Sequence, residues 1–197
     1  MKERLSIFMD RMEEIEKISN DGCEGKDMAA HSHFGHPHSG HSHSGHPYSG
    51  ATEIRRMVPS DISEVERIEK ENFSRPWTAE DYRGFLDRED ADFLVAVENG
   101  RVVGYIGEYG IPDEGDITNV SVDRKCRNRH IGRKLVLELI RAAEERGIRK
   151  IFLEVRESNA PAIRLYENAG FRKTGIRRNY YTSPMENAVL MMRESER

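Results

Sequence analysis

The sequence has few cysteines and no long apolar run, and each shortage excludes a class of protein. Only Cys23 and Cys126 occur in 197 residues, so neither a disulfide framework nor a CxxC metal site can be built from them. No apolar stretch approaches the roughly 18 residues of a membrane-spanning helix. Acidic residues such as Asp10 and Glu13 interrupt the segment where a signal peptide would be apolar. We therefore expect a cytoplasmic protein with no membrane partner.

The sequence also lacks an excess of basic residues. Lys and Arg total 31, Asp and Glu total 35, and the net charge is -4. A protein that binds nucleic acid irrespective of its sequence is distinctly basic, so we expect no nucleic-acid partner. The length predicts one domain with an additional segment.

Composition divides the chain into three zones. Residues 1–30 begin with an amphipathic pattern over 2–19, which predicts a helix that docks on the body or on another subunit. Residues 31–50 are two near-copies of a decapeptide, HSHFGHPHSG and HSHSGHPYSG, and hold seven of the eight histidines. Residues 51–197 alternate apolar and amphipathic stretches, as expected of a folded domain.

The His/Ser/Gly-rich zone, residues 31–50, predicts a disordered linker because its residues cannot form a core. Imidazoles at His-x-His spacing can bind transition-metal ions such as Zn, Ni or Cu. Two interpretations remain open: a solvated linker that binds metal adventitiously, and selected metal binding or storage. No fixed ligand set can be assigned, so we expect no catalytic metal.

The body predicts a mixed order of strands and helices. Strands are expected at 53–58, 92–97, 102–109, 116–122, 151–155, 172–181 and 188–192, and helices at 61–73, 78–87, 131–146 and 160–169. Ser60 and Thr78 are expected to cap the first two helices, and Gly147 and Gly170 to end the last two. The third helix should join two parallel strands by a right-handed crossover. The apolar run 151–155 predicts a strand that is buried on both faces.

A basic loop between an expected strand and an expected helix predicts an anion site. The strand ends at Val122 and the helix begins near Ile131. Free N–H groups and the dipole at a helix N-terminus attract anions, and Arg127, Arg129 and Arg133 add positive charge. A diphosphate fits such a site, and a solvated charged turn is the alternative.

Five segments of the body carry motifs that occur in this order. They are Phe73-Ser74-Arg75-Pro76-Trp77, Arg127-x-x-His130-x-Gly132, LEVRESN at 153–159, LYENAGF at 165–171 and IRRNYY at 176–181. The motif that begins at Arg127 is similar to the Q/R-x-x-G-x-G/A loop that binds the acetyl-CoA pyrophosphate. Together the five motifs resemble the RimI branch of the GNAT N-acetyltransferases, over about residues 53–195. The resemblance implies an α/β GNAT fold, in which helices flank a central twisted mixed sheet.

The resemblance also implies a set of acetyl-CoA contacts. They are Val120, Ser121, Val122, Arg127, Asn128, Arg129, His130, Ile131, Gly132, Arg133 and Asn159. The family usually has Gly at the position of His130, and Gly permits positive φ. A helical φ would accommodate His130 without strain, and a protonated His would add to phosphate binding. Asn159 also fits as the cap of the following helix.

Two further residues have catalytic roles by resemblance. Glu154 is the expected general base and Tyr166 the expected general acid that protonates the leaving thiolate. An α-amino group has a pKa about 2.5 units below that of Lys, which makes its deprotonation about 3.5 kcal/mol easier, so a modest base suffices for an N-terminus. From the residues alone, a salt-bridged strand Glu and a core Tyr are the alternatives.

Aromatic and basic residues near the end of the chain are expected to receive the acceptor. Arg177, Arg178, Tyr180 and Tyr181 would lie in or beside the acceptor loop, with hairpin packing as the alternative. Trp77 is either a wall of the acceptor groove or part of the core.

We therefore expect an acetyl-CoA-dependent Nα-acetyltransferase that acts on a protein N-terminus, foremost the N-terminal alanine of small-subunit ribosomal protein eighteen. A broader GNAT acetyltransferase for other N-termini, lysines or small amines is the first alternative. A metal-handling protein that uses residues 31–50 is the alternative from another class.

Overall fold

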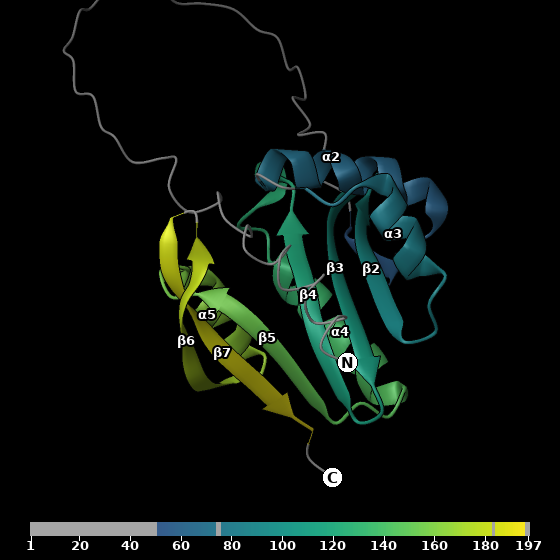
Figure 1. Cartoon of the computed structure of the whole chain (residues 1–197). Helices are drawn as coiled ribbons and strands as arrows, with labels where there is room; N and C mark the ends of the chain where they lie inside the picture. Colours follow the sequence, from purple (N-terminus) through teal and green to yellow (C-terminus); the bar gives the residue numbers. More distant parts are fainter. Residues whose placement is uncertain (1–50, 74–75, 183, 196–197) are drawn as a thin grey trace, which may run out of the picture.

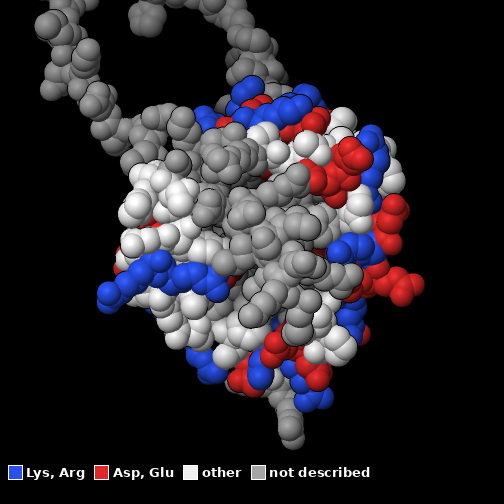
Figure 2. Space-filling model, in the orientation of Figure 1, with Lys and Arg blue, Asp and Glu red and all other residues white. Residues whose placement is uncertain are grey.

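The computed structural model describes residues 51–73, 76–182 and 184–195. The predicted N-terminal helix and the His-rich segment lie outside these residues. On the face seen in Figure 2, basic and acidic side chains are interspersed around α2 (Ile62–Asn72), in line with the nearly balanced composition. No helix of the described residues is long and apolar enough to cross a membrane.

The described residues form strands and helices in the predicted order. The strands are β1 (Glu53–Arg56), β2 (Ala91–Glu98), β3 (Arg101–Ile111), β4 (Glu114–Val122), β5 (Lys150–Arg156), β6 (Arg172–Thr182) and β7 (Met185–Glu194). The helices are α2, α3 (Ala79–Leu86), α4 (Ile131–Glu145) and α5 (Ala160–Asn168), with short 3-10 turns at Pro59–Asp61 and Arg124–Cys126.

Within the described residues the strands form one mixed sheet of seven, in the order β1-β2-β3-β4-β5-β7-β6 (Figure 1). The β4–β5 pair is parallel, and the other neighbours are antiparallel. The predicted parallel connection through the third helix is therefore confirmed. Asn99 and Gly100 adopt positive φ in the turn between β2 and β3, which matches the twist of a two-residue hairpin.

Helices cover both faces of the sheet. On one face α4 packs with alternate residues of β2 such as Leu94 and Ala96, through Leu135 and Leu139. On the other face α2 and α3 cover the intervening residues, such as Val95. In Figure 1, α2 and α3 lie at the top and right, over β2 to β4. We call the α2/α3 side face A and the α4/α5 side face B.

The parallel strands β4 and β5 separate soon after they meet. Their paired positions end at Asp116 and Phe152, and β4 then continues to Val122 with only β3 beside it. Thr118 has no partner at a bulge against β3, which adds local bend and twist to β4. The backbone edge of β4 beyond Asp116 therefore lines an opening in the sheet rather than a ladder with β5.

Several local predictions are confirmed. Thr78 caps α3 in a capping box with Asp81, whose backbone N–H donates to Thr78 Oγ1 at 3.3 Å. Gly147 and Gly170 follow α4 and α5 at φ 88° and 90°, in the left-handed conformation that ends a helix.

Two predictions are wrong. Ser60 does not cap α2, because a 3-10 turn precedes the helix and Asp61 occupies the N-cap position. β5 is not buried on both faces: Leu153 and Val155 are buried on face B, whereas Phe152 and Glu154 are half-buried on face A. The reason is that, of the helices that the structure describes, α2 and α3 lie over β2 to β4 and not over β5 on face A.

Candidate active site

A cavity of about 970 Å³ occupies the opening between β4 and β5 and extends to the N-terminal ends of α4 and α5. Most of the residues predicted for the site line it. They are Val120, Ser121, Val122, Arg127, Asn128, His130, Ile131, Gly132, Arg133, Glu154, Asn159 and Tyr166. Arg129 is not among the lining residues.

The N-terminus of α4 presents free backbone donors to this cavity. The first bond of the helix is from the Lys134 N–H to the His130 carbonyl at 3.0 Å. The N–H groups of Ile131, Gly132 and Arg133 therefore have no partner within the helix. Together with the helix dipole they form a site that favours an anion.

His130 precedes α4 in the left-handed conformation, with φ 60° and ψ 13°. A helical φ, which would have accommodated His without strain, is therefore not what the structure has. Asn128 also has φ 60°, a conformation that the short, locally hydrogen-bonding Asn side chain favours. The backbone adopts the conformation that Gly permits in the related loop, and the His side chain is exposed to solvent.

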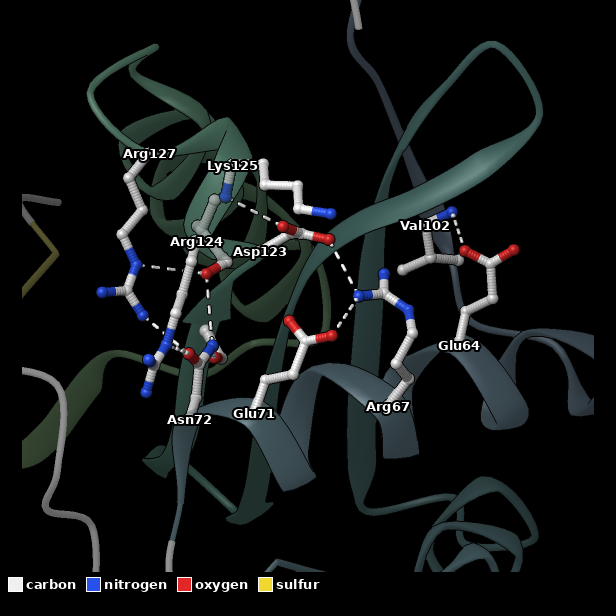
Figure 3. Close-up of polar contacts among 11 residues, drawn as sticks. Glu64, Arg67, Glu71, Asn72, Val102, Asp123, Arg124, Lys125 and Arg127 are labelled. Carbon is white, nitrogen blue, oxygen red and sulfur yellow. Dashed lines mark hydrogen bonds and ion pairs between the residues drawn. The ribbon is translucent and has the colours of Figure 1, made fainter. Parts of the chain in front are cut away.

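The arginines of the loop have different partners. Arg129 donates a hydrogen bond from Nη2 to Glu98 Oε1 at 3.0 Å, and its Nη1 lies 2.9 Å from Oε2 in an ion pair, which explains why it is absent from the cavity. Arg127 donates instead to the side-chain oxygen of Asn72, from Nη2 at 2.7 Å, and lines the cavity (Figure 3). Burial and the neighbouring Arg124 lower the pKa of the Arg127 guanidinium. Because Asn72 is uncharged, its hydrogen bond to Arg127 does not cancel the charge of the guanidinium.

Asn159 caps α5. Its Oδ1 accepts a hydrogen bond from the Ala162 N–H at 3.2 Å, and Pro161 follows in the first turn. The residue also lines the cavity. The predicted capping role is confirmed, and the expected contact with acetyl-CoA stays a prediction.

Glu154 lies on β5 at the edge of the cavity, with its side chain on face A. Its Oε1 is 3.4 Å from Arg177 Nη1, and the side chain is 20% exposed. Burial raises the pKa of this carboxyl, and Arg177 opposes part of the rise. A carboxylate with a raised pKa is a better proton acceptor than an exposed Glu.

Tyr166 enters the cavity from α5. Burial raises the pKa of its phenol to about 12, so the group is protonated at neutral pH. No hydrogen bond to its hydroxyl forms within the described residues, and its ring packs edge-on against Phe171 with centroids 5.8 Å apart. The hydroxyl can therefore donate to a ligand.

A buried carboxylate on α2 was not predicted from the sequence. Glu69 is 1% exposed and accepts hydrogen bonds from Tyr82 at 2.7 Å, from Asn119 at 3.0 Å and from Tyr105. Burial raises its pKa, and these donors lower it. A signal was present, because Glu69 follows Val65 by four residues on the apolar face of the predicted helix.

The aromatic residues on face A separate into core and cavity. Trp77 is 8% exposed and stacks on Phe85 with ring centroids 4.9 Å apart, so it belongs to the core. Tyr181 is buried against the Arg156 guanidinium and lines the cavity. The Arg177 guanidinium lies 4.9 Å from the centroid of Tyr180. Arg177 thus connects Tyr180 to Glu154.

Comparisons with known proteins identify the family of the chain. The model of the acetyltransferase (GNAT) family matches residues 62–171. A Bacillus subtilis protein provisionally named a [ribosomal protein bS18]-alanine N-acetyltransferase is 36% identical over 139 residues, which cover 70% of this chain and 92% of the relative. The Escherichia coli K12 protein named for this activity is 33% identical over 140 residues, covering 70% of this chain and 94% of the relative.

A solved structure shares the fold. The crystal structure of the ribosomal-protein-S18-alanine N-acetyltransferase from Escherichia coli superposes with a TM-score of 0.67 and 32% sequence identity. The match covers 73% of this chain and 94% of the solved one.

Proposed function

Because the chain belongs to the GNAT family of acetyltransferases, we propose that it acetylates the N-terminal alanine of ribosomal protein bS18 with acetyl-CoA. The observation that carries the proposal is that Glu154 and Tyr166 line one cavity with the anion site of α4. The relatives named for bS18 are similar over nearly their whole length, which supports the acceptor.

The residues present fit acetyl-CoA. The free N–H groups of α4 and the Arg127 guanidinium would hold the diphosphate, and the unpaired edge of β4 would face the pantetheine arm. When bound, acetyl-CoA supplies the acetyl group as a thioester. A cavity of this size, between two strands that have separated, accommodates an extended ligand.

Glu154 would accept the proton that the acceptor amine loses as its nitrogen bonds to the acetyl carbon, directly or through water. The α-ammonium of a protein N-terminus loses its proton near pH 7.7–8.0, so a carboxylate with a raised pKa is sufficient. Tyr180 and Arg177 lie beside this carboxylate on face A. We infer that the acceptor enters from face A.

Tyr166 would donate a hydrogen bond to the leaving sulfur. A thiol has a pKa of about 8.5, whereas the Tyr166 pKa is about 12, so complete transfer of the Tyr proton to the thiolate is uphill. The phenol therefore stabilises the developing negative charge mainly as a fixed donor, and solvent completes the protonation.

A peptide with the bS18 N-terminal sequence tests the proposal. The full chain, the peptide and acetyl-CoA should yield one acetyl group on the α-amine, detected by fragment mass spectrometry. Glu154→Gln should lower kcat/KM by about 10² to 10⁴, and the exposed Glu167→Gln should leave it unchanged. Three competing acceptors test the broader GNAT alternative. They are peptides with other N-termini, a peptide whose N-terminus is blocked but whose lysine is free, and a small amine.

Metal binding by residues 31–50 is a separate proposal, supported by seven histidines at short spacing. Calorimetry with ZnCl₂ or NiCl₂ should detect binding to the full chain and not to a variant that lacks 31–50. Acetylation of the peptide should be equal in the two proteins. Because the described residues contain no group of His, Cys, Asp and Glu that could hold a metal, any remaining binding would count against this assignment.

A further inference from the structure

Residues near the end of α2 contact the charged side chains of the β4–α4 loop (Figure 3). Asp123, at the start of this loop, forms an ion pair with Arg67 of α2 at 2.9 Å. Arg67 is shared with Glu71 at the same distance. Arg67 is thus shared between two carboxylates, and the charge of Asp123 also favours the charged form of the Arg127 guanidinium.

Asn72 is the last residue of α2 and is 1% exposed. Its side-chain amide Nδ2 donates to Ser121 Oγ at 2.7 Å and to the Val122 carbonyl at 3.2 Å. These two bonds fix the amide against the end of β4. They also settle which end of the amide is the oxygen, because both acceptors face the nitrogen.

The oxygen of this amide accepts from two guanidinium groups. Arg127 donates from Nη2 at 2.7 Å, and Arg124 donates from Nε at 3.3 Å. Arg127 also donates from Nε to the Val122 carbonyl at 3.4 Å. Within the described part of the chain, Arg127 forms no ion pair with a carboxylate, in contrast to Arg129, which Glu98 neutralises.

The arrangement has a clear electrostatic consequence. A neutral amide orients Arg127 without cancelling its charge, whereas a carboxylate at the same place would cancel it. Burial and Arg124 lower the pKa of the Arg127 guanidinium, and Asp123 opposes part of this effect without pairing with it. An anion in the cavity would therefore interact favourably with the guanidinium.

We propose that Asn72 is a positioning residue for the donor site: it holds the Arg127 guanidinium toward the cavity with its charge uncompensated, so that the arginine can bind the diphosphate of acetyl-CoA. This inference rests on the proposed function, because it assumes that acetyl-CoA is the donor. Asn72 itself does not line the cavity and acts through Arg127.

The first experiment measures CoA binding by calorimetry on the full chain. Asn72→Ala should weaken CoA about tenfold, the effect of one hydrogen bond to a charged group. The KM for acetyl-CoA should rise by a similar factor, and kcat at saturation should remain near the wild-type value. Glu71→Gln is the matched control, because it changes the same turn of α2 and leaves Arg67 paired with Asp123.

A truncated donor separates positioning from a general structural role. S-acetylpantetheine lacks the diphosphate, so Asn72→Ala should leave its kcat/KM unchanged. Arg127→Ala should weaken CoA as well, and adding Asn72→Ala to that variant should cause little further loss. A loss of the same size with both donors, or effects of the two substitutions that multiply, would overturn the proposal.

A second variant keeps the test decisive if Asn72→Ala does not fold. Asn72→Asp has the same shape and still accepts from Arg127, but its negative charge cancels that of the guanidinium. It should weaken CoA at least as much as the alanine variant, and more at low salt. CoA binding equal to wild type would refute the inference, whereas a wild-type chain that binds no CoA would refute the proposed function instead.

Discussion

The chemistry of the site depends on how single residues are placed relative to charge and burial. Glu154 is half-buried and has one cation beside it, whereas Tyr166 is buried and its hydroxyl has no hydrogen-bond partner among the described residues. The two environments shift both pKa values upward, for the same reason, with different consequences. The carboxylate becomes a better base, and the phenol becomes a permanent donor.

Arg177 sets the pH dependence of Glu154. Because Arg177 lowers the pKa of the carboxyl that burial raises, Arg177→Gln should move the acid limb of kcat/KM to higher pH. The active form is the carboxylate, so activity falls as the pH decreases through its pKa. Acetylation rates from pH 5 to 9 measure this shift, and Arg178→Gln serves as the neighbouring control. An acid limb of kcat/KM that stays at the same pH would show that Arg177 does not lower the pKa of Glu154 in the active enzyme.

His130 carries a conformational cost. A side chain in the left-handed conformation costs about 1 kcal/mol relative to Gly, so His130→Gly should raise the free energy of unfolding by about that amount. Asn128→Gly, at the same φ, should gain less than half as much, because Asn tolerates this conformation. Urea unfolding of the two variants makes the comparison. No gain from His130→Gly would mean that His130 is not strained, and equal gains would mean that its cost is no larger than that of Asn128.

At the scale of elements, the sequence predicted the order of strands and helices and the parallel connection through α4. Thr78, Gly147 and Gly170 have local signals at the helix ends, and each was placed correctly. The prediction that Ser60 caps α2 is wrong because Asp61 is paired with Arg55 at 2.6 Å, a contact between elements that no local pattern encodes. The same applies to Asn72, whose partners lie about fifty residues away.

The bulge of β4 depends on a close approach between β3 and its neighbours. A Cβ on Gly107 would lie 2.3 Å from the Phe93 ring and 2.8 Å from Thr118 Oγ1. Gly107→Ala should therefore destabilise the protein by about 1–3 kcal/mol.

Gly84 gives the matched comparison for this substitution. It lies within α3 with nothing within 4 Å of its added Cβ, so Gly84→Ala should stabilise the protein by about 0.5–1 kcal/mol. Chemical denaturation of both variants provides the test. Destabilisation of similar size at the two positions would contradict the steric argument.

At the scale of the whole molecule, the carboxyl groups of Asp116 and Glu154 cluster on face A near the point where β4 and β5 separate. Burial and the nearby Glu154 raise the pKa of Asp116 to about 6, from 3.8. On face B, burial raises the pKa of Glu108 to about 7, although Arg146 at the end of α4 opposes the rise. The family resemblance anticipated Glu154, but the cluster could not be predicted, because it depends on strand register and on a bulge.

This cluster predicts a loss of stability as the pH rises. A carboxyl whose pKa is higher in the folded state stabilises the fold most when protonated, and this contribution is lost as the pH rises from 3.8 through about 6. The Asp116 shift corresponds to up to about 3 kcal/mol at 1.36 kcal/mol per pKa unit. Asp116→Asn should therefore be more stable than wild type at pH 8 and nearly equal to it at pH 4. Urea unfolding of both proteins at the two pH values measures this. A difference in midpoint between variant and wild type that is the same at pH 4 and at pH 8 would count against this origin.

The separation of β4 from β5 has a consequence for how such an enzyme can change. In the donor site that we propose, recognition draws on backbone N–H groups and one oriented arginine, which most side-chain replacements elsewhere leave intact. The opposite side of the sheet presents side chains alone: a carboxylate, a guanidinium and tyrosines. Mutation can therefore retune which amine is accepted while the thioester carrier continues to bind, so that new specificities arise without rebuilding the catalyst.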